Sequence, residues 1–299
     1  MTTSFETALA ARAQAVETRL GEILSPDHPL LAGTPARLLA AMRHGVLNGG
    51  KRLRPFLVLE SAALFDGDGQ AASDVAAALE CVHSYSLVHD DLPAMDDDDL
   101  RRGQPTVHRA FDEATAILAG DGLLTIASGL VAGAEGASPA ARLELVRRLA
   151  VQAGPGGMVG GQALDLAAET EDLAEVEISV MQAMKTGALI AFACEAGPIL
   201  AGAAMEDVLR LRRFGEIVGL AFQLADDLLD ETADAAALGK AAGKDRARGK
   251  KTLPALHGHD WTRRRLAELV ADGTALLAPY GDRAGPLLDA ARFIAERTR

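Results

Sequence analysis

The sequence contains little cysteine and few aromatic residues. Its 299 residues include two cysteines, one tryptophan and two tyrosines, and aromatic residues make up 4% of the chain. Cys81 and Cys194 both lie in apolar, helix-like segments without a CxxC spacing, so neither a disulfide framework nor a zinc site is predicted. Clusters of β-branched residues are also few, whereas Ala, Leu, Glu and Arg are plentiful. This composition favours helices.

Positive charge is also in short supply. The formal net charge is −12 at pH 7, which argues against a nucleic-acid-binding protein because such proteins usually present a basic face. The same overall charge would repel an anionic substrate. Any site for such a substrate would therefore need local basic groups or metal ions to reverse the field.

Long uninterrupted apolar runs are missing. The first twenty residues contain Glu6 and Glu17 and lack a continuous apolar core, unlike a signal peptide. The most apolar window, residues 188–205, is interrupted by Glu195 and Pro198, which argues against a membrane span. We therefore expect a soluble, cytoplasmic protein.

Helical periodicity is the dominant pattern. Apolar spacing, punctuated by glycine and proline, predicts helices over about 4–24, 35–48, 54–65, 71–91, 107–131, 139–152, 155–168, 173–185, 187–202, 205–231, 261–277 and 283–298. No alternating pattern persists long enough to build a sheet. We therefore predict an all-α fold with a single domain spanning residues 1–299.

Two clusters of aspartates each follow an apolar, helix-like stretch. They comprise Asp90, Asp91 and Asp96 in the first cluster, and Asp226, Asp227 and Asp230 in the second. Like charges ~4 Å apart repel by roughly 4 kcal/mol at an effective dielectric constant near 20, so carboxylates at the end of a buried helix need a cation beside them. All-oxygen ligands favour Mg²⁺, which commonly shares its coordination shell with substrate phosphates. We hypothesise a metal-diphosphate site; for the first cluster alone, a solvated acidic loop is the alternative.

The two clusters differ in spacing. Asp226 and Asp230 are one turn apart on the same face of a helix. Asp90 and Asp96 would point about 240° apart on a straight helix. Pro93, however, disfavours a helical conformation at the residue before it. We therefore predict that the helix ends or bulges there and that the following turn brings Asp96 back near Asp90.

Short basic groups lie near both clusters. Lys51 and Arg54 follow Gly49-Gly50, where glycine lets backbone approach a phosphate and the basic side chains supply charge. The other groups are Arg101 and Arg102 after the first cluster, Lys185 and Thr186 at a helix break, and Lys240, Lys244, Lys250 and Lys251 in the glycine-rich loop after the second cluster. Each group alone is typical of a charged surface patch. Their joint placement beside the aspartates favours an anion site.

Together these residues resemble the trans-isoprenyl diphosphate synthase family, and most closely its bacterial farnesyl diphosphate synthases. The two aspartate clusters match the family motifs DDxxxxD and DDxxD. The GGKRxRP segment at 49–55, the RRG at 101–103, Lys185-Thr186 and Phe222-Gln223 also fit. The resemblance spans roughly residues 40–256, and the basic end, Arg297-Thr298-Arg299, suits a tail that could cover a diphosphate.

The resemblance implies a bundle of antiparallel helices around a central apolar substrate cavity. It further implies Mg²⁺-dependent head-to-tail condensation of isopentenyl diphosphate with dimethylallyl or geranyl diphosphate, giving farnesyl diphosphate. Several Mg²⁺ ions per site are expected, with Mn²⁺ as an alternative ion. The chain is expected to form a homodimer, and its other partners would be these small-molecule diphosphates.

Site roles carry over to matching positions. The catalytic group comprises Asp90, Asp91, Asp96, Asp226, Asp227 and Lys185. The metal ligands are Asp90, Asp96, Asp226 and Asp230. The isopentenyl diphosphate site comprises Lys51, Arg54, His83 and Arg102. The allylic diphosphate site comprises Arg101, Lys185, Thr186, Gln223, Lys240 and Lys250.

Product length depends on the residues that precede the first cluster. At ~1.5 Å per residue, Tyr85 lies about 7.5 Å below Asp90 along the helix axis, so its ring could form the floor of a tunnel for the growing chain. Within the resembled family, an aromatic residue here next to Ser86, with Pro93 and Ala94 as two extra residues, implies the fifteen-carbon product. The alternative is that Tyr85 is an ordinary core residue. Lys251 departs from the family pattern, which more often has an uncharged residue there.

Three other functions remain as alternatives. One is a geranyl or geranylgeranyl diphosphate synthase of the same family. A class I terpene cyclase is disfavoured because residues 226–230 lack the Asn/Asp, Ser/Thr and Glu pattern of its second metal motif. A non-catalytic regulatory subunit is disfavoured because both aspartate motifs are intact.

Overall fold

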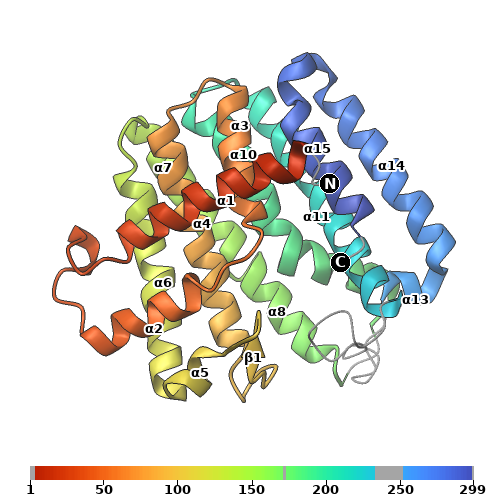
Figure 1. The fold of residues 1–299 in the computed structure, drawn as a ribbon. Helices are drawn as coiled ribbons and strands as arrows, with labels where there is room; N and C mark the ends of the chain where they lie inside the picture. The colour runs from red at the N-terminus through yellow and green to blue at the C-terminus, as the bar shows by residue number, and fades with distance from the viewer. Residues whose placement is uncertain (1–3, 171–172, 233–251, 298–299) are drawn as a thin grey trace. The chain divides into compact units, whose positions relative to one another are not determined.

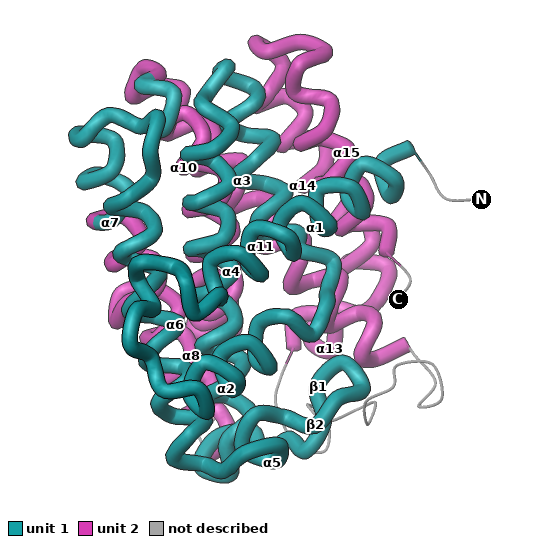
Figure 2. Tube along the Cα trace, turned by 60° about the vertical axis from the view of Figure 1, so that its left-hand side comes forward, with its two compact units in different colours: residues 1–146, 199–202 teal, residues 147–198, 203–299 magenta. Residues whose placement is uncertain are grey.

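The computed structural model describes residues 4–170, 173–232 and 252–297, which form helices joined by turns and loops, with one short hairpin (Figure 1). This confirms the all-α prediction. The hairpin pairs β1 (Leu100–Arg101) antiparallel with β2 (Gln104–Pro105), and the sequence pattern did not predict it. The described residues form two compact units, 1–146 with 199–202 and 147–198 with 203–299 (Figure 2). The single-domain expectation stays a prediction.

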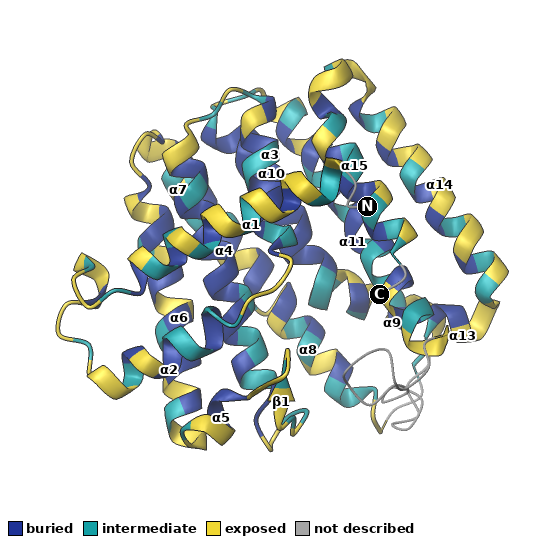
Figure 3. Cartoon of the chain, in the orientation of Figure 1, coloured by how far each residue is buried: buried dark blue, intermediate teal, exposed yellow. Residues whose placement is uncertain are grey.

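The first unit is built around α4 (Gly69–Asp90). Asp68 caps its start by accepting a hydrogen bond from the backbone N–H of Ala71 at 2.8 Å, and the helix is buried over most of its length (Figure 3). It contacts the helices α1 (Ser4–Ile23), α2 (Ala36–Val46), α3 (Leu53–Leu64) and α6 (Glu113–Gly133). Because neighbours surround α4, both its ends and its polar residues are held in fixed positions. The unit also contains η1 (Pro29–Leu31), α5 (Val107–Ala110) and the first residues of α7 (Pro139–Ala153).

One predicted helix of the first unit is wrong. The sequence pattern predicted a single helix over 107–131, but α5 ends at Ala110 and α6 begins at Glu113. Asp112 caps α6, because its side chain accepts a hydrogen bond from the N–H of Thr115 at 2.7 Å. An aspartate that caps a helix satisfies donors that a continuous helix would use internally, so the chain breaks here.

The second unit is organised by α11 (Met205–Thr232). This helix contacts α13 (Leu253–His257), α14 (His259–Leu277) and α15 (Gly285–Glu296). It also contacts η2 (Ala183–Gly187), a π-helical turn that joins α9 (Glu175–Gln182) to α10 (Ala188–Leu200). The two helices predicted at 173–185 and 187–202 therefore form one continuous rod. The unit is completed by α8 (Met158–Ala167) and η3 (Ala278–Ala284).

Two helical segments are long and apolar enough to cross a membrane by length and composition. In Glu175–Leu200, 78% of the most apolar window is buried within the protein, and in Glu113–Gly133 the share is 44%. The first behaves as a core helix of its unit. The second keeps apolar side chains exposed, among them Ile117, Leu118 and Leu124.

Candidate functional site

The first aspartate motif lies where α4 ends. Asp90 is the last helical residue, and the backbone N–H of Asp96 donates to the carbonyl of Asp90 at 2.8 Å. The chain therefore turns back on the helix end, which confirms the break predicted from Pro93. Both carboxylate-bearing residues, Asp90 and Asp96, are half-buried, so a turn of backbone holds them close together without sealing them from solvent.

Asp91 is more deeply buried than its neighbour Asp90. It is buried, and Arg101 of β1 donates to it from Nε, 2.8 Å from Oδ1 and 3.0 Å from Oδ2. The short hairpin thus carries Arg101 back to the motif that precedes it. A carboxylate held by two hydrogen bonds from one guanidinium is oriented as well as neutralised, so Asp91 braces the turn that bears Asp90 and Asp96.

The basic loop before α3 has an unusual backbone. Gly49 and Gly50 have φ of 78° and 127°, and Arg52 also lies in the left-handed region at 49°. The φ of 127° at Gly50 is one that residues with a Cβ rarely adopt, and the guanidinium of Arg102 lies directly beside this glycine. Arg102 donates to Asn48 Oδ1 at 2.8 Å and to the carbonyl of Gly49. The structure therefore brings the loop and Arg102 together, as the site prediction requires.

Arg52 was not among the predicted site residues, and the structure gives it a prominent role. Its side chain is buried and forms ion pairs with Glu17 of α1 and Glu80 of α4, and it donates to the carbonyl of Val46 at 2.5 Å. These contacts anchor the loop from within while Lys51, the preceding residue, stays exposed. Sequence patterns gave no signal for this role, because the acidic partners are far away along the chain.

His83 and Arg54 are neighbours in the same region. Arg54 Nη1 lies 3.4 Å from His83 Nε2. Burial, followed by the positive charge of Arg54 and then of Arg102, holds the pKa of His83 well below its usual value. His83 is therefore neutral at pH 7 in the free protein. A neutral imidazole has one N–H donor and one acceptor nitrogen. The N–H of His83 can therefore donate a hydrogen bond to an oxygen atom of an anion.

The second aspartate motif lies on the last turns of α11. Asp226 and Asp230 are exposed, whereas Asp227 is buried. Arg297, just after α15, donates to Asp226 Oδ1 at 2.8 Å and to the carbonyl of Phe222 at 2.9 Å. Its guanidinium also lies 4.2 Å from the centre of the Phe222 ring. The basic end of the described chain thus contacts Asp226, one of the two exposed aspartates of the motif.

Asp227 is held by two amides. Gln182 donates to its Oδ2 at 2.8 Å and Gln223 donates to its Oδ1 at 2.7 Å. Gln223 in turn accepts a hydrogen bond from the hydroxyl of Thr186 at 3.0 Å. Thr186 and Gln223, both predicted for the allylic diphosphate, are therefore brought together. Gln182 was missed, because an isolated glutamine on an apolar helix carries no sequence signal.

Lys185 lies in the π-helical turn η2 and pairs with Asp165 of α8, with Nζ 2.7 Å from Oδ2. Helices α8 and η2 approach backbone to backbone here: a Cβ at Gly161 would stand 2.6 Å from Lys185 Cα. Such turns often mark functional positions, because the extra residue re-aims side chains. Asp165 and Gly161 were missed, although the sequence Gly160-Gly161-Gln162 before an aspartate on a helix is a usable signal.

Gln162 is a further polar residue that the sequence did not single out. Within the described part of the chain, neither its Oε1 nor its Nε2 has a hydrogen-bond partner, and both atoms are buried. Buried amides are nearly always satisfied.

The remaining predicted residues are placed as follows. Tyr85 is buried in α4, and its ring meets that of His89 edge-on at 5.7 Å. Ser86 donates its hydroxyl to the carbonyl of His83 at 2.8 Å. Lys240, Lys244, Lys250, Lys251, Thr298 and Arg299 lie outside the described residues.

The donor set of both motifs is suited to Mg²⁺. Over residues 4–170, 173–232 and 252–297, no group of three or more His, Cys, Asp or Glu side chains is arranged as a metal site by itself. The solvent-accessible carboxylates are Asp90, Asp96, Asp226 and Asp230. Carboxylates that supply one or two ligands each, with substrate phosphates and water completing the shell, are the arrangement typical of Mg²⁺.

Comparison with known proteins agrees with this chemistry. The sequence profile described as polyprenyl synthetase matches residues 35–275. A farnesyl diphosphate synthase from Geobacillus stearothermophilus is 44% identical over 255 residues, covering 85% of this chain and 84% of the relative.

Two solved structures have the same fold. An FPP/GFPP synthase from Zymomonas mobilis superimposes with a TM-score of 0.86 at 41% identity, covering 99% of this chain and 100% of that one. A geranyltransferase from Helicobacter pylori, complexed with magnesium and isoprenyl diphosphate, gives a TM-score of 0.85 at 31% identity, covering 99% of both chains. The resemblance inferred from the motifs is confirmed, and the chain belongs to the polyprenyl synthetase family.

Proposed function

We propose that this protein is a Mg²⁺-dependent prenyltransferase that condenses isopentenyl diphosphate with dimethylallyl or geranyl diphosphate to give farnesyl diphosphate and diphosphate. The main support for the proposal is that the two motifs share one pattern of burial. In each Asp-Asp pair, the second carboxylate is buried and held by fixed donors, while the first is accessible. This is the division expected if one residue of each pair binds metal and the other orients it.

Asp90, Asp96, Asp226 and Asp230 would hold the Mg²⁺ ions, with Mn²⁺ as a substitute. The bound ions would stabilise the negative charge that develops on the departing allylic diphosphate. Lys185, Thr186, Gln223 and Arg101 would donate to the same diphosphate, together with Lys240 and Lys250. Asp91 and Asp227 would act by orienting the motifs.

Lys51, Arg54, His83 and Arg102 would bind the diphosphate of isopentenyl diphosphate. Neutral His83 would donate one hydrogen bond to an oxygen of this group, while the arginines supply the charge that the acidic chain otherwise lacks. The C3–C4 double bond of isopentenyl diphosphate would attack C1 of the allylic cation, so that C4 forms the new carbon–carbon bond. A proton would then leave C2 to give the C2–C3 double bond of the new unit, and the released diphosphate would accept that proton. The reaction needs no side-chain nucleophile.

Tyr85 would limit the product to fifteen carbons. Its ring is buried in α4 at a level below Asp90, where a growing chain attached to the allylic diphosphate would extend. A rigid aromatic ring supported edge-on by His89 offers a floor that a flexible side chain would not.

The apolar stripe on α6 would form a homodimer interface in the cytoplasm. Ile117, Leu118 and Leu124 are each at least 39% exposed, and seven-residue spacing places the first and last on one face of the helix. Sedimentation velocity should therefore give the mass of two chains, and Leu118→Glu should shift the protein to monomer.

The test of the proposed function is product analysis. The purified full-length chain should convert labelled isopentenyl diphosphate with dimethylallyl or geranyl diphosphate to farnesyl diphosphate in the presence of Mg²⁺. Chelation should stop the reaction, and added Mn²⁺ should restore it in part. A hydrocarbon made from farnesyl diphosphate alone would instead support a cyclase, and absence of turnover with either starter would support a regulatory subunit.

A further inference from the structure

Arg297, the residue that follows α15, is held against the last turns of α11. Its Nη2 donates to Asp226 Oδ1 at 2.8 Å and to the carbonyl of Phe222 at 2.9 Å, and its guanidinium lies 4.2 Å from the centre of the Phe222 ring. The Arg297 side chain is 11% exposed, compared with 54% for that of Asp226. The guanidinium is therefore a largely buried cation that is hydrogen-bonded to an accessible carboxylate.

This guanidinium interacts with the whole second motif. Burial lowers the pKa of Arg297, and the carboxylates of Asp226, Asp227 and Asp230 oppose that shift. All three aspartates thus lie close enough to interact with its charge. The two amides that hold Asp227 donate hydrogen bonds to it without supplying charge. Because neighbouring carboxylates repel one another, the guanidinium stabilises the motif before any metal ion binds.

A divalent ion bound by Asp226 would compete with Arg297. In the proposed function Asp226 is a Mg²⁺ ligand, and Mg²⁺ coordinates carboxylate oxygens at ~2.0–2.1 Å. An ion at that distance from either oxygen of Asp226 would lie close to the guanidinium that already bonds to Oδ1. Two cations at short range repel each other, and the repulsion doubles when one of them is divalent. The carboxylate therefore cannot hold both without a penalty.

Arg297 can leave Asp226 without disturbing the helix that precedes it. Helix α15 ends at Glu296, and the backbone of Arg297 is extended, with φ −61° and ψ 139°. Its buried Nε has no hydrogen-bond acceptor among the residues that the structure describes, although buried donors are nearly always paired. Movement of the side chain into water would satisfy this donor. A competing cation can therefore displace the guanidinium.

We propose that Arg297 is an internal counter-ion that a divalent metal ion must displace from Asp226 when it binds to the second motif. The guanidinium stabilises the three carboxylates before metal binds, and it weakens the binding of a free divalent ion to the same group. This inference rests on the proposed role of Asp226 as a metal ligand. It adds a determinant of metal affinity that lies outside both aspartate motifs.

The metal affinity of the full-length, substrate-free protein tests the proposal. Mn²⁺ alone is the probe, and electron paramagnetic resonance measures the ion that stays free in solution. Arg297→Gln should bind Mn²⁺ about fivefold more tightly than the parent protein, the effect expected when one partly exposed ion pair no longer competes. If the variant bound Mn²⁺ no more tightly than the parent, or did not bind it at all, the proposal would be overturned.

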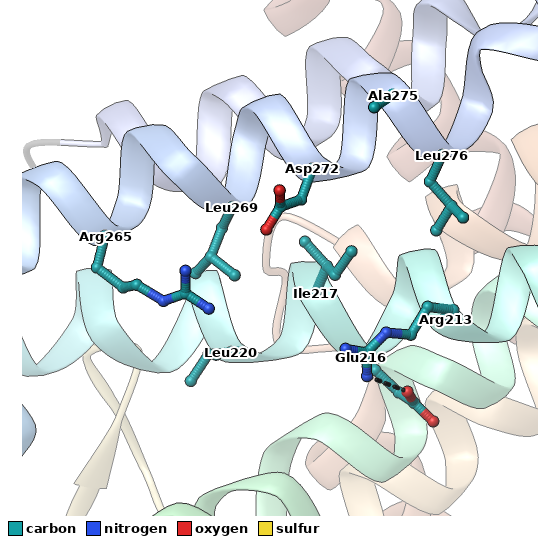
Figure 4. Close-up of a pocket in the computed structure, with 9 residues that line it drawn as sticks. All are labelled: Arg213, Glu216, Ile217, Leu220, Arg265, Leu269, Asp272, Ala275 and Leu276. Carbon is teal, nitrogen blue, oxygen red and sulfur yellow. Dashed lines mark hydrogen bonds and ion pairs between the residues drawn. The ribbon is translucent and has the colours of Figure 1, made fainter.

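Arg213→Gln is the matched control. Arg213 is a guanidinium on the same helix as Asp226, and it pairs with Glu216 beside a groove between α11 and α14 (Figure 4). It lies about 20 Å from Asp226 along the helix axis, beyond the Debye length of about 8 Å at 0.15 M ionic strength. The control should leave the Mn²⁺ affinity unchanged. An equal gain in both variants would show a general effect of net charge and contradict the proposal.

A double-mutant cycle assigns the effect to Asp226. In an Asp226→Asn background, Arg297→Gln should lose most of its effect on Mn²⁺ affinity, because the carboxylate for which the two cations compete is gone. A gain of full size in this background would show that Arg297 acts on metal binding elsewhere, and the proposal would be wrong.

Product analysis separates this inference from the proposed enzyme function. If the protein condenses prenyl diphosphates but Arg297→Gln leaves the Mn²⁺ affinity unchanged, only this inference fails. If Arg297→Gln raises the Mn²⁺ affinity through Asp226 but the parent protein has no transferase activity, only the proposed enzyme function fails.

Discussion

Arg101 donates to both oxygens of Asp91, with Nε 2.8 Å from Oδ1 and 3.0 Å from Oδ2. The relationship has a counterpart in the second motif, where Gln182 and Gln223 donate to the two oxygens of Asp227. In both Asp-Asp pairs the second aspartate is thus buried and accepts hydrogen bonds at both oxygens, and the first is more accessible to solvent. Adjacent aspartates that look equivalent in sequence therefore have separate structural roles.

Arg101→Gln should destabilise the protein. The side chain of Asp91 is 4% exposed. Removing the guanidinium leaves this buried carboxylate unpaired, which should lower the free energy of unfolding by about 3 kcal/mol. Urea unfolding should show this decrease. Arg109→Gln is the matched control, because Arg109 and its partner Asp99 have side chains that are 55% and 63% exposed. The control should remain within about 0.5 kcal/mol of the parent protein, and a similar decrease in both variants would contradict the prediction.

Asp226→Ala and Asp227→Ala should differ in kind. The side chain of Asp226 is 54% exposed, so its loss should leave the unfolding free energy within about 1 kcal/mol of the parent while abolishing condensation. Asp227→Ala leaves the buried amide of Gln182 and the half-buried amide of Gln223 without their acceptor and should cost about 1–3 kcal/mol in stability as well. Asp90→Ala should behave like Asp226→Ala. Steady-state kinetics and urea unfolding of the three variants check this, and an active Asp226→Ala protein would remove that residue from the metal site.

Tyr85→Ala should lengthen the product. Removal of the ring opens space below Asp90 for further five-carbon units, whereas Tyr85→Phe keeps the ring and should still yield fifteen carbons. Chromatography of the dephosphorylated products distinguishes the two variants. The proposed floor would be wrong if Tyr85→Ala made the same product as the parent.

Arg52→Gln should weaken both stability and isopentenyl diphosphate binding. Glu80, at 3% side-chain exposure, would become an unpaired buried charge, at a cost of about 3–5 kcal/mol. The loop that bears Lys51 would also lose its anchor, so the KM for isopentenyl diphosphate should rise more than that for the allylic substrate. Arg12→Gln is the control, since Arg12 is 43% exposed in its pair with Glu60; a rise in both KM values by equal factors would argue against a local role.

His83 should make stability depend on pH. Its pKa in the folded protein lies below the ordinary value because of burial and the nearby positive charges of Arg54 and Arg102. The unfolded chain therefore binds a proton that the folded protein does not, and stability falls as pH decreases through about 6.5. The difference between the urea midpoints at pH 7.5 and pH 5.5 should be smaller in His83→Gln than in the parent protein. An unchanged pH dependence in that variant would show that His83 is not the titrating group.

The end of α4 was predictable from sequence. The pairing of Asp91, just after this helix, with Arg101 was not. Pro93 restricts the backbone locally, so the end of the helix and the return of Asp96 towards Asp90 followed from neighbouring residues. The start of α6 at Glu113 was missed, because Asp112 competes with a helical pattern that would otherwise continue. Sequence patterns predict a backbone feature when the residue that causes it lies close to it in the chain, as Pro93 does to the end of α4.

Sequence alone determined the helical class, the two aspartate motifs, the basic loop and hence the family. These depend on composition, period and spacing, which are properties of short segments. Tertiary structure decided which aspartate of each pair is buried, that Arg52 anchors a loop through Glu17 and Glu80, and that Gln182 donates to Asp227. Those outcomes depend on contacts between residues far apart in the chain, where burial converts ordinary polar side chains into fixed partners because an unpaired buried group is costly.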